Sequence, residues 1–208
     1  MTPTDSEPAR LRSVAETLAT EAAEFVRGRR AEIFGVHPAG AGSGSAVRAK
    51  TTPTDPVTVV DTDTERLLRT RLAQLRPGDP ILGEEGGGPS ASTATAAGAV
   101  TWVLDPIDGT VNFVYSIPAY AVSVGAQVGG VSVAGAVADV VGGKVYSAAV
   151  GRGAHVTDAQ GSRELRCTGV DELSMSLLGT GFGYSTRRRA AQAAVLAGML
   201  PMVRDVRR

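Results

Sequence analysis

The chain has 208 residues, in which 21 Lys or Arg side chains balance 21 Asp or Glu side chains. This balance argues against a dedicated nucleic-acid binder, whose basic excess would neutralise phosphates. The length and the 43% of hydrophobic residues indicate a sizeable core, and the single cysteine excludes an intramolecular disulfide. No apolar run reaches the length of a membrane helix and no secretory signal begins the chain, so we expect a cytoplasmic protein without membrane contact.

The N-terminal segment predicts a helix that is followed by a loop and a strand. Apolar side chains recur at three- and four-residue steps over residues 11–26, which is typical of an amphipathic helix. Residues 37–49 are rich in glycine and have no periodicity, so they predict a mobile loop, with Lys50 at its end. The β-branched residues 57–60 predict a short strand that ends at Asp61.

A second helix is predicted after this strand. Thr62 and Glu65 have the spacing of a capping box, in which each side chain binds a backbone N–H at the start of a helix. Leucines then continue at helical spacing, and the Pro77-Gly78 pair predicts the end of the helix.

Most of the remaining chain predicts strands. Glycine pairs separate several of the apolar runs, which indicates hairpins and therefore antiparallel strands. The expected strands cover residues 81–82, 100–104, 122–128, 131–140, 144–149, 156–157, 164–167 and 177–181. A helix over residues 185–200 follows. The whole pattern predicts an α+β fold in which helices and an antiparallel sheet form layers.

Carboxylates come at the ends of three predicted strands: Asp61, Glu84, and the pair Asp105 and Asp108. Acidic side chains gathered where strands pass into loops indicate a shared site for a hard cation. Carboxylate and carbonyl oxygens are the ligands that Mg²⁺ prefers. The sequence therefore predicts a magnesium site at these strand ends.

The segment from Trp102 to Phe113 concentrates these features. Asp105 leaves a buried strand, and Asp108 returns to the same side three residues later, so both carboxylates can reach one cavity. Gly109 permits close approach of the backbone to a ligand, and its amide and that of Thr110 can face an oxyanion.

Each of these pieces alone favours a simpler interpretation. Asp108 before a glycine is typical of a turn, and Glu84 before a second glutamate is typical of a solvated acidic turn. Asp55 before a proline can initiate a turn, and Lys50 alone fits a solvated loop charge. Their occurrence together, in this order and after apolar strands, favours a functional site.

The combination resembles the inositol monophosphatase family, which belongs to a lithium-sensitive, magnesium-dependent superfamily that also includes fructose-1,6-bisphosphatases. The matching pieces are Lys50-x4-Asp55-x5-Asp61, Gly83-Glu84-Glu85, and the run from Trp102 through Asp105-Pro106-Ile107-Asp108-Gly109-Thr110 to Phe113. The resemblance implies a layered αβαβα fold, a homodimer, and a phosphatase that hydrolyses inositol monophosphate with metal-activated water and is inhibited by Li⁺.

The resemblance also implies a set of ligands for two or three magnesium ions. They are Glu84, Asp105 and the carbonyl of Ile107 for the first ion, and Asp105 with Asp108 for the second. A third ion near the mobile loop is supported by Glu84, Lys50 and Asp55.

The same resemblance implies the catalytic and substrate-binding groups. Asp61 and Thr110 orient and deprotonate the attacking water, and Glu84 belongs to the catalytic set. The amides of Gly109 and Thr110 hold the phosphate, and Glu84 and Asp108 are further substrate-binding residues.

The sequence also bears on alternative functions. Haloacid-dehalogenase-type phosphatases carry Asp-x-Asp-Gly-Thr, whereas two residues separate Asp105 from Asp108 here, so a phosphoaspartyl intermediate does not fit. Histidinol phosphate, fructose 1,6-bisphosphate and 3′-phosphoadenosine nucleotides stay open as substrates. A non-catalytic partner of the transcription antitermination machinery, or of RNA, is the less favoured alternative, because aromatic residues for stacking are scarce.

One motif of the family is absent from these 208 residues. The family carries Trp-Asp-x-x-Ala-Gly, whose aspartate completes the second metal site, and no such segment occurs in this sequence. We therefore expect residues 1–208 to form a single, incomplete catalytic domain whose own hydrolysis of inositol 1-phosphate is negligible.

Overall fold

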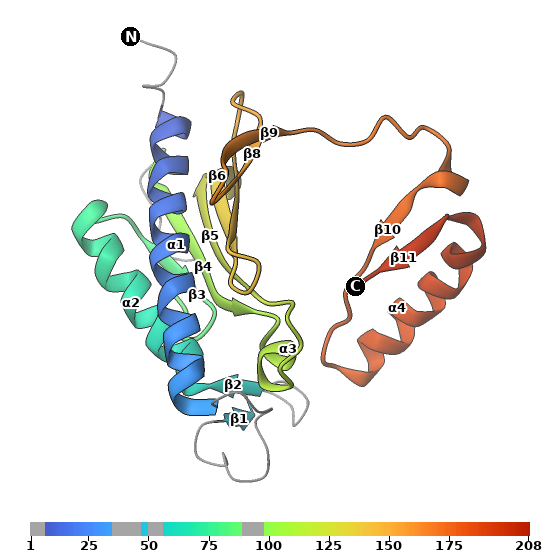
Figure 1. Cartoon of the computed structure of the whole chain (residues 1–208), viewed down its shortest axis with the longest axis horizontal. Helices are drawn as coiled ribbons and strands as arrows, with labels where there is room; N and C mark the ends of the chain where they lie inside the picture. The colour runs from blue at the N-terminus through green and yellow to red at the C-terminus, as the bar shows by residue number, and fades with distance from the viewer. Residues whose placement is uncertain (1–6, 35–46, 50–55, 89–97) are drawn as a thin grey trace. The chain divides into compact units, whose positions relative to one another are not determined.

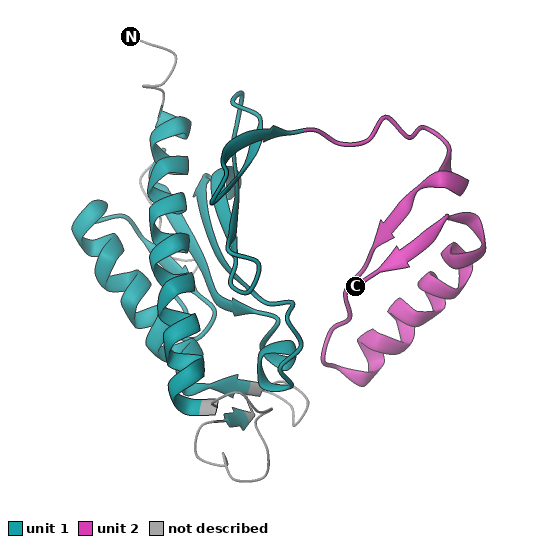
Figure 2. Ribbon diagram, viewed as in Figure 1, with its two compact units in different colours: residues 1–48, 56–165 teal, residues 49–55, 166–208 magenta. Residues whose placement is uncertain are grey.

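The computed structural model describes residues 7–34, 47–49, 56–88 and 98–208, and Figure 1 labels most of their helices and strands. The chain divides into two compact units, which Figure 2 colours separately. Unit 1 comprises residues 1–48 and 56–165, and unit 2 comprises residues 49–55 and 166–208. Each unit has its own helices and strands.

Unit 1 contains a large sheet with helices against it. Its helices are α1 (Glu7–Phe34), α2 (Val59–Leu75) and α3 (Thr110–Val114). Its strands are β1 (Val47–Ala49), β2 (Pro56–Thr58), β3 (Ile81–Gly83), β4 (Val100–Asp108), β5 (Ala121–Val128), β6 (Val131–Asp139), β7 (Lys144–Ala149), β8 (Ala154–Asp158) and β9 (Gly161–Leu165).

The large sheet has seven strands in the order β3-β4-β5-β6-β7-β8-β9. Each strand from β4 onward runs antiparallel to the next, as the predicted hairpins require. β3 instead pairs parallel to β4, so the sheet is mixed. The strands β1 and β2 form a separate two-stranded pair. Because of the parallel pair, β3 and β4 run in the same direction and their carboxyl ends lie at the same edge.

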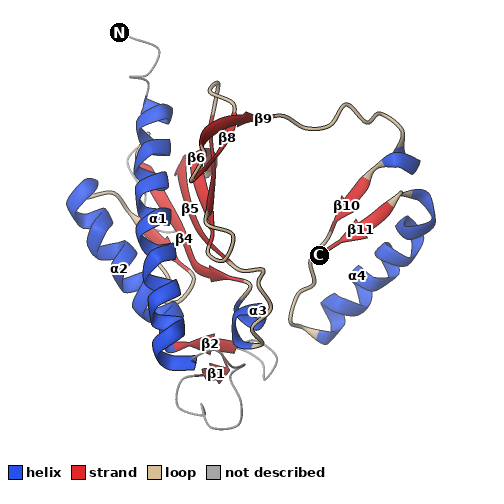
Figure 3. Ribbon diagram, viewed as in Figure 1, coloured by secondary structure: helices blue, strands red, loops and turns tan. Residues whose placement is uncertain are grey.

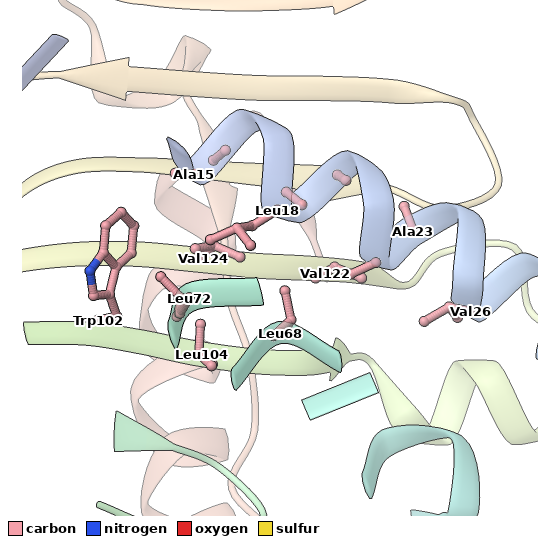
Figure 4. Packing of buried hydrophobic residues seen from close by; sticks show 14 of the residues in the cluster. Ala15, Leu18, Ala23, Val26, Leu68, Leu72, Trp102, Leu104, Val122 and Val124 are labelled. Atoms are coloured by element: carbon pink, nitrogen blue, oxygen red, sulfur yellow. The ribbon is translucent and has the colours of Figure 1, made fainter. Parts of the chain in front are cut away.

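The core lies between this sheet and the helices α1 and α2. α1 packs against β5, β6 and β7, and α2 packs against β4 and α1, as the ribbon in Figure 3 shows. Leu18 of α1, Leu68 and Leu72 of α2, and Trp102 and Val124 of the sheet meet there, as seen in Figure 4. The predicted α+β class is confirmed, with helices layered on a sheet that is mostly antiparallel.

The predicted amphipathic face of α1 is confirmed. Leu11, Ala15, Leu18, Ala22 and Val26 are fully buried and recur at three- and four-residue steps. Several of these side chains are alanines, which lets the helix approach the sheet closely and costs little side-chain entropy.

The start of α2 differs from the prediction. Residues 59 and 60 were expected in a strand, yet α2 begins at Val59, because Thr58 caps the helix and forms a capping box with Asp61. The predicted box of Thr62 and Glu65 is therefore wrong, since both residues lie inside the helix. Asp61 belongs to the first helical turn and does not stand at the end of a strand.

The strand β4 is longer than predicted and contains an irregularity. It continues through Asp105 to Asp108, and its pairing with β5 shifts register between these two residues. Asp105 pairs with Ser123 and Asp108 with Ala121, so three steps along β4 match two along β5. A bulge of this kind bends the strand and redirects its side chains.

Unit 2 consists of helix α4 (Thr186–Met199), short 3₁₀ helices at Leu173–Met175 and Leu200–Met202, and the strands β10 (Leu177–Gly179) and β11 (Asp205–Arg207). β10 and β11 pair in parallel. The predicted strand at 177–181 is thus shorter than expected, and β11 was not predicted. None of the helices that the structure describes is long and apolar enough to span a membrane.

Candidate active site

Asp61 is the most firmly held of the predicted catalytic residues. Its side chain is 1% exposed in the first turn of α2. Oδ2 accepts hydrogen bonds from the Thr58 backbone N–H (2.9 Å) and the Thr58 hydroxyl (2.5 Å). That hydroxyl in turn accepts from the Val60 N–H at 3.1 Å. The capping interaction therefore fixes one oxygen of the carboxylate, and the other oxygen faces the start of α3.

Thr110 meets that second oxygen. Its buried hydroxyl lies 3.1 Å from Asp61 Oδ1 and 3.0 Å from the carbonyl oxygen of Ile107. A hydroxyl has one proton, so it donates to one of these two acceptors at a time and keeps a lone pair for another donor. The structure therefore brings three of the predicted site residues into one hydrogen-bonded group.

Glu84 and Asp105 lie at adjacent points of the parallel pair β3 and β4. Gly83, the last residue of β3, pairs with Leu104, and the next residues along the two chains are Glu84 and Asp105. The Glu84 N–H donates to the Leu104 carbonyl at 3.1 Å. The shared direction of the two strands thus places both carboxylate-bearing residues at one sheet edge, as the sequence predicts.

A buried glutamate of α2 holds the turn that follows Glu84. Glu65 is 3% exposed, and its carboxylate accepts from the backbone N–H of Glu85 at 2.7 Å and of Gly86 at 2.8 Å. Arg69 donates its Nε to the same carboxylate at 2.8 Å and its Nη2 to the Gly87 carbonyl. These bonds connect α2 to the turn.

Asp108 and Gly109 form the passage from β4 into α3. Asp108 is exposed at the end of the strand, beyond the bulge. Gly109 has φ +95°, a conformation that disfavours a side chain, and a Cβ there would lie 3.0 Å from the Ala119 carbonyl oxygen. Thr110 begins α3, so its N–H has no acceptor within that helix.

Aromatic side chains pack around the segment that connects β4 to α3. The rings of Phe113 and Tyr120 meet edge to face, with centroids 5.2 Å apart, and the guanidinium of Arg30 lies 5.6 Å from the centre of the Phe113 ring. Arg30 also donates to the Ser116 hydroxyl at 2.6 Å. Burial raises the pKa of the Tyr120 hydroxyl, so it stays neutral.

The donor chemistry at this edge fits a hard cation. Glu84 and Asp105 supply carboxylate oxygens, and the Ile107 carbonyl is an uncharged oxygen ligand of the kind that Mg²⁺ accepts. Within the described residues, no three His, Cys, Asp or Glu side chains converge into a ready-made metal cluster. The donors thus have suitable chemistry, and their assignment as ligands stays a prediction.

Two predicted site residues, Lys50 and Asp55, lie outside the described residues. Their expected role in supporting a third ion therefore stays a prediction.

The residues that sequence reasoning missed are those that hold the site in place. Thr58 was placed inside a strand, although a threonine three residues before an aspartate is itself a capping signal. Glu65 was assigned to a helix cap, and Arg69 was not considered. Their i, i+4 spacing was the available signal for an ion pair on one helix face.

A shallow hollow of about 770 Å³ lies elsewhere on unit 1. It extends over β5 to β8, and Val133, Val137, Tyr146 and Val150 are among its lining residues. None of the predicted catalytic residues lines it, so we do not associate it with the chemistry.

Comparison with known proteins yields one consistent family. The model of the inositol monophosphatase family matches residues 7–208. The inositol-1-monophosphatase SuhB of Mycobacterium tuberculosis H37Rv is 76% identical over 208 residues, which are 100% of this chain and 71% of that protein.

Solved structures agree with this result. Mycobacterium tuberculosis SuhB matches with a TM-score of 0.78 and 66% identity, covering 98% of this chain and 70% of that one. The structure of SaIMPase-II with bound inositol monophosphate matches with a TM-score of 0.68 and 25% identity, covering 95% of this chain and 64% of that one. The predicted fold type is confirmed by these neighbours.

Proposed function

Since the chain belongs to the inositol monophosphatase family, a family of metal-dependent phosphatases, we propose that it hydrolyses inositol monophosphate to inositol and phosphate with Mg²⁺. The observation that carries the proposal is the hydrogen-bonded group of Asp61, Thr110 and the Ile107 carbonyl. It combines a buried base with a hydroxyl at the sheet edge where Glu84 and Asp105 lie. Such a combination suits the activation of a water molecule beside a bound phosphate.

The proposed magnesium ligands are those that the resemblance implies. Glu84, Asp105 and the Ile107 carbonyl would hold the first ion, and Asp105 with Asp108 the second. A bound Mg²⁺ supplies positive charge that neutralises a phosphate dianion and lowers the pKa of a water molecule. The third ion, with Glu84, Lys50 and Asp55, stays a prediction.

The proton is moved by Asp61 and Thr110 in this proposal. Thr110 accepts a proton from the attacking water while it passes its own proton to Asp61 Oδ1, which lies 3.1 Å away. Because Thr58 occupies Oδ2 with two donors, Oδ1 is the oxygen that receives the proton. The hydroxyl thus ends with one proton, and the aspartate becomes a neutral acid.

The phosphate is held, in the same proposal, by the backbone amides of Gly109 and Thr110. The positive φ of Gly109 supports this role, because it lets the chain turn sharply from β4 into α3 without a side chain in the way. Glu84 and Asp108 are the further proposed substrate-binding residues. SaIMPase-II, whose structure holds inositol monophosphate, supports the choice of substrate.

Further predictions accompany the proposed activity. Inhibition by Li⁺, a homodimeric state, a cytoplasmic location and one incomplete catalytic domain over residues 1–208 stay predictions. The other substrates considered above differ in the alcohol that carries the phosphate, so they are alternatives to be compared in one assay.

The test is phosphate release from inositol 1-phosphate at high protein concentration, with and without Mg²⁺ and with added Li⁺. We expect release that requires Mg²⁺ and falls with Li⁺. Histidinol phosphate, fructose 1,6-bisphosphate and a 3′-phosphoadenosine nucleotide are compared under the same conditions. Faster release from one of these would overturn the substrate, and release without any divalent ion would overturn the metal dependence.

A further inference from the structure

Glu65 is a buried carboxylate with no role in the proposed chemistry. It lies one helical turn after Asp61 on the same face of α2, at 3% exposure. A carboxylate is expensive to bury unless ionic and hydrogen-bonding partners surround it. An apolar side chain could fill the same buried position and would need no such partners. The partners that the chain supplies here therefore indicate what Glu65 is for.

Those partners all belong to, or reach toward, one turn. The carboxylate accepts from the N–H groups of Glu85 and Gly86, and Arg69 pairs with it through Nε. Arg69 also donates to the Gly87 carbonyl, so the side chains of one helix bind three successive residues of the turn. The Glu65 carboxylate therefore binds the backbone N–H groups of the turn in the way a bound anion would, and Arg69 is its counter-ion.

The glycines of the turn are required for this contact. A Cβ at Gly83 would lie 2.3 Å from Glu65 Oε1, and a Cβ at Gly86 would lie 2.7 Å from the same atom. Real Cβ atoms do not approach an oxygen so closely, so any side chain at these positions would push the carboxylate away. The backbone is thus shaped to receive Glu65.

Glu84 stands between two of these fixed points. Its own N–H donates to the Leu104 carbonyl at 3.1 Å, and the N–H of the next residue, Glu85, donates to Glu65. Both peptide groups of Glu84 are therefore held, one by β4 and the other by α2, while its side chain is exposed. This arrangement fixes the backbone position from which the Glu84 side chain extends.

We propose that Glu65, with Arg69 as its counter-ion, is a positioning residue that fixes the backbone of Glu84 so that the Glu84 carboxylate is presented beside Asp105. The inference rests on the proposed function, in which Glu84 is a metal ligand. Asp61 and Glu65 are four residues apart on one helix, so α2 holds the base and the metal-binding turn together. Glu65 acts through Glu84 and touches neither metal nor substrate.

The test is Glu65→Gln in the full chain, with two measurements on the protein. The first is hydrogen exchange of the Glu85 and Gly86 amides without metal, and the second is Mg²⁺ affinity by calorimetric titration. The amide retains an acceptor oxygen but loses the charge that pairs with Arg69. We expect exchange of the two amides to become at least about tenfold faster, and Mg²⁺ affinity to fall about tenfold.

Glu21→Gln is the matched control. Glu21 of α1 binds Arg71 of α2 through two hydrogen bonds of 2.7 and 2.9 Å, so its loss also breaks a Glu–Arg pair on α2 but touches no residue of the turn. We expect it to change neither the exchange of the turn amides nor the Mg²⁺ affinity. A merely structural role for Glu65 would lower the melting temperature and leave Mg²⁺ affinity unchanged, which overturns the proposal.

Arg69→Lys tests the proposal even if Glu65→Gln does not fold. Lysine keeps a positive charge but cannot donate to Glu65 and to the Gly87 carbonyl as one planar group. We expect a drop of about threefold in Mg²⁺ affinity, and wild-type affinity in this variant would contradict the positioning role.

Glu84→Gln separates the two proposals. If it binds Mg²⁺ as the wild type does, the ligand assignment of Glu84 fails. If it loses affinity and Glu65→Gln does not, only the positioning role fails. In either case, unchanged exchange at Glu85 and Gly86 in Glu65→Gln would show that Glu65 does not hold the turn.

Discussion

Substituting Asp61 by Asn should separate the stability of the protein from its catalysis. The two side chains have the same shape, and the environment accepts the amide in one orientation. Its oxygen can accept the two Thr58 donors, and its NH₂ can donate to the Thr110 hydroxyl, which then donates to the Ile107 carbonyl 3.0 Å away. The Thr58 donors and the Thr110 hydroxyl thus keep their partners in Asp61→Asn.

The two effects differ in size. Hydrogen bonds to a charged acceptor are roughly twice as strong as neutral ones, so weakening the two Thr58 bonds costs about 2 kcal/mol, partly offset because a neutral amide is cheaper to bury. We expect a net loss of about 1–2 kcal/mol, or about 2–4 °C of melting temperature per kcal/mol in a chain of this size. Removal of a general base lowers the rate by about 10²–10⁴-fold, equivalent to about 3–5 kcal/mol in the barrier.

The assay combines thermal unfolding with phosphate release from inositol 1-phosphate in Mg²⁺, at protein concentrations that make a slow wild-type rate measurable. Asp63→Asn is the control, because Asp63 lies on the same helix and binds Arg29 and Arg66 away from the site. We expect the control to lose some stability and little rate. A folded Asp61→Asn protein with more than about one-tenth of the wild-type rate would refute Asp61 as the base.

Three other substitutions test the same structure. Gly83→Ala places a Cβ 2.3 Å from the Glu65 carboxylate, so we expect a loss of about 1–3 kcal/mol in urea unfolding; an unchanged midpoint would mean that the turn moves freely. Arg71 lowers the pKa of Glu21 below its ordinary 4.5, so their pair should stabilise the fold above that pH and cease to do so as the pH falls through the lowered value. The difference in melting temperature between the wild type and Glu21→Gln should therefore shrink as the pH falls through the lowered pKa of Glu21, and a constant difference would contradict the pairing. Asp105→Asn removes a charge from both proposed metal sites and should weaken Mg²⁺ binding by about tenfold or more and abolish phosphate release, whereas near-normal release in saturating Mg²⁺ would argue against the assignment.

The parts of the fold that the sequence predicted are those in which periodicity decides the structure. The spacing of Leu11, Ala15 and Leu18 alone indicates the buried face of α1, and the glycine pairs after β5 and β6 indicate hairpins. The adjacency of Glu84 and Asp105 was also predictable, because each directly follows an apolar run that the sequence predicts as a strand. In these cases the local sequence pattern and the tertiary structure favour the same residue types at the same positions.

The errors arose where two local signals competed. The β-branched Val59 and Val60 favour a strand by propensity, yet the Thr58 cap satisfies the first backbone donors of α2 and lets both valines enter the helix. Glu65 fits a capping box three residues after Thr62, but the backbone N–H groups that it binds are 20 and 21 residues away along the chain. Long-range contacts of this kind leave no mark in a single local window, so only the structure reveals them.

The cap of α2 also has a consequence for motion. Helix ends open locally more readily than helix centres, and Asp61 is both the residue that closes the first turn of α2 and the proposed base. Each brief opening of that turn would release Thr58 from the carboxylate and remove the base from Thr110 at the same moment. The fraction of time for which the first turn is closed is therefore an upper limit on the fraction of molecules ready to react, and hydrogen exchange at the Val60 and Asp61 amides would measure it directly.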